Sequence, residues 1–179
     1  MKIAEILIIG INQDYKDFML SVLALDGQSI VDVDIYQLEI DTELKVLFYD
    51  LDLDHRIPVE FIDHVKPHLA GVLIITDSSF SLKSTPKRDF VNDLVSELGD
   101  LGANKDIPII VAVGFNGEEE SSISENLQVS GFYLSKNSRL LLWNSNNIDS
   151  IKKIWRSLLV DLQKESTPVQ LDKSTPTTS

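Results

Sequence analysis

Residues 30–51 read IVDVDIYQLEIDTELKVLFYDL and predict two strands joined by a short turn. In the first strand, the alternation of apolar and polar residues slips by one position between Ile35 and Tyr36. The slip predicts either a bulge or a strand whose two halves face different neighbours. The turn lies at residues 41–43, and an apolar run follows at 44–51. A turn of three residues is too short for a crossover, so we expect the two strands to be antiparallel.

The rest of the chain alternates between strand and helix patterns. Four further apolar runs predict buried strands, at 3–9, 71–77, 107–113 and 139–143. Five segments with helical spacing predict helices, at 17–25, 59–69, 88–98, 121–128 and 149–164. Units that alternate in this way form a mainly parallel sheet with helices on both faces. The sequence therefore predicts a three-layer α/β fold, in which a six-stranded, mostly parallel sheet contains one antiparallel strand.

Length, charge and composition limit the classes of function. We expect one domain at residues 1–164 and a disordered tail at 165–179, which is rich in Ser, Thr and Pro. The net charge of −12 disfavours nucleic acid and anionic membranes as partners. No apolar stretch is long enough for a membrane span, and the chain has no cysteine for lipid attachment. We expect a cytoplasmic protein without membrane insertion or a lipid anchor.

The segment GINQDYKD, which follows the first strand, partly matches a phosphate-binding loop. Such a loop has the pattern G-x-x-x-x-G-K-[ST] between a strand and a helix. Gly10 and Lys16 have the required spacing, whereas Tyr15 replaces the second glycine and Asp17 replaces the hydroxyl residue. The Tyr15 side chain would crowd a phosphate, and the carboxylates of Asp14 and Asp17 would repel it. The segment therefore predicts a vestigial nucleotide site.

The strand order and this loop together resemble the Ras-like small GTPases over residues 1–164. The nearest group is the bacterial and archaeal (Mgl-type) small GTPases, whose fourth strand is similar to LAGVLIITDSS at residues 69–79. The resemblance implies a P-loop NTPase fold. It also implies further nucleotide contacts, of which Asp50 is kept at the D-x-x-G position while Leu53 replaces the glycine. The segments GFNG and NSN do not match the family's N-K-x-D and S-A-K-like motifs.

The resemblance with these departures implies a non-catalytic, small-GTPase-like module for protein interaction, or pseudo-GTPase. Such a module would act in a signalling or polarity and motility pathway, with no catalytic residue, cofactor or metal. Small GTPases bind partners through their second and third strands and the loop that follows. The corresponding candidate partner-binding residues are Tyr36, Leu38, Asp52, His55 and Arg56. For the Mgl-type group, the expected partner is a roadblock-type protein.

Two alternatives remain open at this stage. A divergent GTP-binding protein or GTPase would hold GTP or GDP through Lys16 and would hold Mg²⁺ through Asp17 or Asp50. A receiver-like domain would use an aspartate at the end of a strand, such as Asp50, as its phosphoacceptor. Receivers also need two acidic residues after the first strand, where this chain has Gly10 and Asn12. The sequence favours a protein that is not an enzyme, and the enzymatic possibility that stays open is a GTPase.

Overall fold

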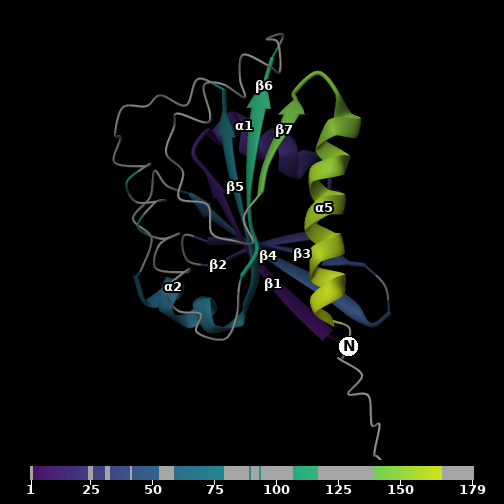
Figure 1. The fold of residues 1–179 in the computed structure, drawn as a ribbon. Coiled ribbons are helices and arrows are strands. Elements are labelled where there is room, and N and C mark those ends of the chain that lie inside the picture. Colours follow the sequence, from purple (N-terminus) through teal and green to yellow (C-terminus); the bar gives the residue numbers. More distant parts are fainter. Residues whose placement is uncertain are drawn as a thin grey trace, which may run out of the picture.

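The fold is built on one twisted sheet (Figure 1). The computed structural model describes residues 2–23, 26–30, 33–40, 42–52, 59–78, 89, 93, 107–116 and 139–166. The strands are β1 (Lys2–Gly10), β2 (Asp26–Ile30), β3 (Val33–Glu39), β4 (Leu44–Asp52), β5 (Leu69–Asp77), β6 (Ile109–Phe115) and β7 (Arg139–Asn144). The helices are α1 (Gln13–Ser21), α2 (Val59–Val65), the short 3₁₀ helix η1 (Lys66–His68) and α5 (Ile148–Ser166).

The described strands lie in the order β2-β3-β4-β1-β5-β6-β7. Of these seven, β3 alone runs opposite to the others, because it pairs antiparallel with both β2 and β4. The pairs β1–β4, β1–β5, β5–β6 and β6–β7 are parallel. The protein is therefore an α/β protein with a mostly parallel sheet and one antiparallel strand, as predicted, and its layout is compatible with a Rossmann-like arrangement.

Among the described residues the sheet has seven strands, where the sequence predicted six. The predicted strand at 30–40 is only part of a hairpin, because residues 26–30 form the additional strand β2 at the edge of the sheet. This segment reads DGQSI and contains a single apolar residue, so it shows no hydrophobic alternation. The pattern from which a strand is predicted is therefore missing from this segment.

The slip in hydrophobic phase within β3 marks a change of face. The register between β3 and β4 is continuous from Val33 to Glu39, without a bulge. Val33 and Ile35 pack into the core cluster on one face of the sheet, whereas Tyr36 and Leu38 pack against the cluster on the other face. Of the two predicted explanations, the second is therefore correct.

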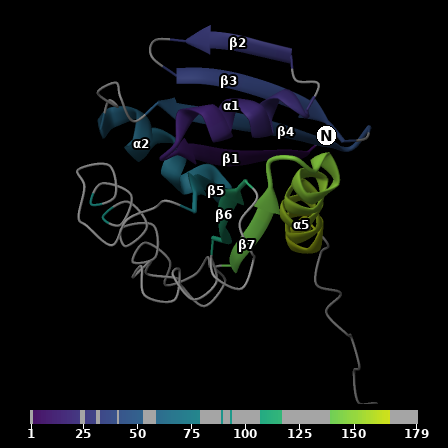
Figure 2. The same cartoon turned by 90° about the horizontal axis from the view of Figure 1, so that it is seen from above.

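Each face of the sheet carries its own hydrophobic core. On one face, Met19 of α1 and Trp155 of α5 are buried in the same cluster, and the Trp155 indole donates to the Met19 carbonyl at 3.3 Å. On the other face, Phe61 of α2 packs against Tyr49 of β4, with ring centroids 5.6 Å apart. Figure 2 shows the helices arranged along the twisted sheet. Burial of these apolar surfaces is the main force that holds the layers together.

Several predicted boundaries shift or lie outside the described residues. Helix α5 includes Glu165 and Ser166, which the sequence assigned to the tail, and the ends of helices are commonly uncertain by this much. The rest of the predicted tail and the predicted helices at 88–98 and 121–128 lie outside the described residues, apart from two isolated helical positions. None of the described helices has the length and apolarity needed to cross a membrane.

Candidate functional site

The connection between β1 and α1 is short, and its polar groups form hydrogen bonds within the protein. It consists of Ile11 and Asn12, and the Ile11 N–H donates to the Ile75 carbonyl of β5 at 2.8 Å. Asn12 is the N-cap of α1, and its side-chain oxygen accepts a hydrogen bond from the Tyr15 N–H at 3.2 Å. Its carbonyl accepts from the Lys16 N–H at 3.1 Å. Two N–H groups that a phosphate-binding loop would turn toward an anion are therefore bonded within the helix start.

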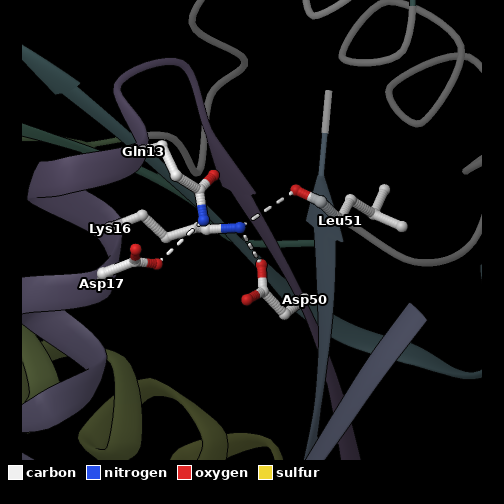
Figure 3. Close-up of polar contacts among 5 residues, drawn as sticks. All are labelled: Gln13, Lys16, Asp17, Asp50 and Leu51. Carbon is white, nitrogen blue, oxygen red and sulfur yellow. Dashed lines mark hydrogen bonds and ion pairs between the residues drawn. The ribbon is translucent and has the colours of Figure 1, made fainter. Parts of the chain in front are cut away.

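The side chain of Lys16 is buried against β4. It is 1% exposed, and its ammonium donates to Asp50 Oδ1 at 2.5 Å (Figure 3). A longer contact of 3.5 Å joins the same nitrogen to the Leu51 carbonyl. The aliphatic stem crosses Gly10 so closely that a Cβ there would lie 2.6 Å from Lys16 Cδ. Gly10 is therefore required by the close approach of the lysine stem.

The carboxylate of Asp50 lies in an electrostatically unfavourable place. Asp50 is 8% exposed, and this burial raises the pKa of its carboxyl above the ordinary value. The hydrogen bond and charge of Lys16 act in the opposite direction and lower that pKa, whereas the nearby carboxylates of Asp34 and Asp17 raise it. The ammonium of Lys16 thus supplies the positive charge that Asp50 needs in the interior.

Tyr15 points toward β6 and β7, whereas Lys16 points toward β4. Its ring lies against Gly114, where an added Cβ would overlap the ring and would come within 2.7 Å of Trp143. The Tyr15 and Trp143 rings stand nearly perpendicular with centroids 5.2 Å apart, and Phe18 stacks on the same indole at 6.2 Å. Trp143 is 1% exposed, and among the described residues its N–H has no hydrogen-bond partner.

The structure therefore brings together some of the predicted nucleotide-site residues and separates the others. Gly10, Lys16 and Asp50 form one contact group. Asp14 and Asp17 are exposed on α1, and Asp17 accepts a hydrogen bond from Gln13 at 2.8 Å (Figure 3). Tyr15 belongs to an aromatic group with Trp143 and Phe18, where its ring occupies space beside Gly114 near the end of β6.

The predicted partner-binding residues lie partly in the core. Tyr36 and Leu38 are half-buried on β3 and pack against the cluster that contains α1 and α5. Asp52 is the last residue of β4. His55 and Arg56 lie outside the described residues.

Sequence reasoning missed two polar contacts at the carboxyl ends of the strands. The Asn12 amide donates to Asp77 at the end of β5, and the Asn146 amide donates to Asn116 at 2.7 Å. An Asn immediately before a helix is a known N-cap signal, so Asn12 could have been found from the sequence. Trp143 gave no such signal, because its neighbours on α1 and β6 are remote in the chain.

Comparisons with models of known protein families and with curated protein sequences find no match to this chain. Within the part of the chain that the structure describes, no group of three His, Asp or Glu side chains is arranged to hold a metal ion.

Proposed function

We propose that the chain is a pseudo-GTPase, a Ras-like domain that binds a protein partner and does not use nucleotide. The observation that carries this proposal is the buried ion pair between Lys16 and Asp50. A phosphate-binding lysine must present its ammonium to the ligand. Here the ammonium is turned into the protein, and moving it out would leave Asp50 as a buried, unpaired charge.

Two further observations support a site without nucleotide. The N–H groups of Tyr15 and Lys16 are bonded to Asn12, so they are not directed toward an external anion. The exposed carboxylates of Asp14 and Asp17 stand on the same turns of α1 and would repel a phosphate. A nucleotide would therefore have to break internal contacts and approach against negative charge.

The proposed partner surface is on the β3 side of the sheet and includes Tyr36 and Leu38. In a small GTPase the bound nucleotide controls the shape of the partner surface. In this chain, Tyr36 and Leu38 of β3 pack against the hydrophobic core, and no nucleotide takes part in that packing in our proposal. Partner binding is therefore constitutive in our proposal. A roadblock-type protein in a signalling or polarity and motility pathway is the proposed partner, and the cytoplasm is the proposed location.

A nucleotide titration tests the proposal directly. Fluorescent GDP and GTP analogues are added to the full chain with Mg²⁺, and isothermal calorimetry with unlabelled nucleotide provides a second measurement. We expect no saturable binding in the micromolar range. Micromolar or tighter affinity in the unmodified chain would overturn the proposal. A double variant, Lys16→Met with Asp50→Leu, would then show whether Lys16 holds the nucleotide without leaving a buried charge unpaired.

One observation favours the alternative of a divergent GTP-binding protein or GTPase. Gly10, Lys16 and Asp50 remain in contact at the junction of β1 and α1, so a rearranged loop could release Lys16 to a phosphate and Asp50 or Asp17 to Mg²⁺. In that case GTP binding should require Mg²⁺ and should disappear in the double variant. Release of inorganic phosphate, measured over the same protein preparation, would separate a GTPase from a protein that only binds GTP.

The partner surface is tested separately with Tyr36→Ala. The candidate roadblock-type protein is added to the unmodified chain and to the variant, and complex formation is measured by calorimetry. We expect the variant to bind more weakly, because Tyr36 is half-exposed on β3. Leu38→Asp is informative only when circular dichroism shows the native spectrum, because Leu38 also packs against the core. Unchanged binding in a folded variant would mean that another surface is used.

A further inference from the structure

The outer part of the sheet presents a row of side chains beside α1. Asp34, Tyr36, Leu38 and Ile40 alternate along β3 and its end, so they share the face on which α1 lies. The three apolar members pack against the core but remain half-exposed. Figure 2 shows β2 and β3 toward one edge of the sheet, and α5 lies toward the other edge, beside β7. The row is thus at the margin of the described core.

The neighbour of Tyr36 on the edge strand is a glycine. In the antiparallel register, Tyr36 lies opposite Phe48 of β4 on one side and opposite Gly27 of β2 on the other. Residues that face each other across two strands share one face of the sheet, and their side chains normally pack together. Phe48 and Tyr36 both belong to the hydrophobic cluster on this face, whereas the residue of β2 opposite Tyr36 is a glycine.

The surroundings of Tyr36 are negatively charged. Asp34 is exposed two residues away on the same face, and Asp17 is exposed on α1. Burial raises the pKa of the Tyr36 hydroxyl, and the carboxylates of Asp34, Asp50 and Asp17 raise it further. The ammonium of Lys16 is buried in an ion pair with Asp50.

We propose that Tyr36 and Asp34 receive an arginine side chain from an extended segment of a partner protein. A guanidinium stacks on an aromatic face and forms paired hydrogen bonds with a carboxylate, two properties that match this ring and this acid. Gly27, which lies opposite Tyr36 in the register of β2 and β3, adds no side chain at this position. The net charge of −12 attracts a basic partner over longer distances.

This inference rests on the proposed function as an interaction module and specifies the chemistry of its partner. It also separates arginine from lysine. A lysine ammonium can meet the Asp34 charge, but it has neither the planar group that stacks on Tyr36 nor the paired donors. Because β2 is the last strand at one end of the described sheet, an extended partner segment is favoured, since its backbone can pair with a strand at a sheet edge.

The probe is a random peptide library displayed on phage and selected against the full chain. Enriched peptides are then synthesised, and their affinity is measured by fluorescence anisotropy. We expect the enriched peptides to contain arginine and to lose about tenfold in affinity when that arginine is replaced by lysine. We expect a similar loss for Asp34→Asn and for Tyr36→Leu.

Gly27→Thr tests the position opposite Tyr36 on β2. Threonine is well suited to a strand, so the edge strand should be retained, while its side chain would stand opposite Tyr36. We expect this variant to bind the arginine peptide at least about tenfold more weakly. The matched control is Asp63→Asn, which removes one exposed negative charge from α2 on the other face and should change affinity less than twofold. Circular dichroism confirms that each variant has the native spectrum.

Three results would overturn the inference: no enrichment, enriched peptides without arginine, or equal affinity for the unmodified chain, Asp34→Asn and Gly27→Thr. None of these depends on the nucleotide titration. Micromolar GTP binding would overturn the proposed absence of nucleotide while leaving the arginine contact measurable. Failure of the peptide experiment would leave the absence of nucleotide unaffected.

Discussion

Tyr15 and Lys16 are neighbours near the start of α1, and they anchor the helix in opposite chemical ways. The Lys16 ammonium is buried against Asp50, and the attraction between them offsets part of the cost of removing two charges from water. The Tyr15 ring packs on Gly114 and Trp143, where no charge is desolvated. One side chain fills the space beside β4, and the other fills the space beside β6 and β7.

The two anchors differ in what they require of their surroundings. The ionic anchor requires a matched charge, so it fails when either charge is removed alone. The aromatic anchor requires a shape, so it fails when its space is filled or emptied. A glycine lies under each anchor, Gly10 under the lysine stem and Gly114 under the tyrosine ring. The same helix start therefore combines one contact that is sensitive to charge and one that is sensitive to volume.

Lys16→Met should cause the largest loss of stability. Methionine keeps an unbranched apolar stem but removes the ammonium, so Asp50 becomes a buried carboxylate without its partner. We expect the free energy of unfolding to fall by about 3–5 kcal/mol. Urea denaturation followed by circular dichroism measures this change.

The control for Lys16→Met is the double variant in which Asp50 is also replaced by Leu. Apolar replacement of both members of a buried ion pair is often neutral or stabilising. We expect the double variant to recover most of the stability that the single variant loses. A double variant as unstable as Lys16→Met would show that the loss comes from packing of the lysine stem and not from the unpaired charge.

Gly114→Ala should destabilise the aromatic anchor by about 1–3 kcal/mol, because the new methyl group would overlap the Tyr15 ring and force a shift. The same denaturation experiment measures the loss. In a Tyr15→Ala background the ring is absent, so we expect Gly114→Ala to cost less there. A double-mutant cycle gives the coupling between the two positions. An equal cost in both backgrounds would assign the clash to Trp143, which would lie 2.7 Å from the added carbon.

The pH dependence of the two single variants should separate the anchors further. Burial already raises the pKa of Asp50, and Lys16→Met removes the group that lowers it, so this pKa rises again in the variant. A carboxyl whose pKa is raised in the folded state favours folding at low pH, and this contribution is lost as pH rises through the folded pKa. We therefore expect the deficit of Lys16→Met to shrink as the pH is lowered from neutral. The deficit of Gly114→Ala should stay constant over the same range, and parallel curves for the two variants would contradict the assignment.

Elements with a strong apolar pattern could be predicted from the sequence, and elements without one could not. The buried strands are continuous apolar runs, so β1 and β5 were found within two residues of their ends. The edge strand β2 was missed because DGQSI carries almost no apolar signal. The helix α1 was expected at 17–25 but begins at Gln13, because the N-cap at Asn12 determines its start more strongly than the apolar spacing does.

At the candidate site, the spacing along the chain predicted that Gly10 and Lys16 lie close together, but it did not predict the direction in which the Lys16 side chain points. The strand-to-helix context of Gly10 and Lys16 correctly indicated that they belong together, and Asp50 is their neighbour. That the lysine turns inward depends on the depth of Asp50 in the sheet, which no local pattern encodes. Tyr15 was expected to crowd a phosphate, whereas its ring contacts Trp143, a residue brought close only by the fold.

Asn12 lies just before both anchors, and its replacement should cause the smallest loss of stability. This loss can be divided between two contacts of the Asn12 side chain. Its oxygen caps α1 at the Tyr15 N–H, and its amide donates to Asp77. Asn12→Ala removes both contacts and should cost about 1 kcal/mol. Asn12→Ser keeps a capping oxygen but has no amide to reach Asp77, so we expect a loss of only a few tenths of a kcal/mol if the cap is the dominant contribution. Asn12→Asp also keeps the cap but places a second carboxylate beside Asp77, and it should be less stable than Asn12→Ser at neutral pH. Equal stabilities for the Ser and Ala variants would show that the contact with Asp77, and not the cap, holds the helix start between its two anchors.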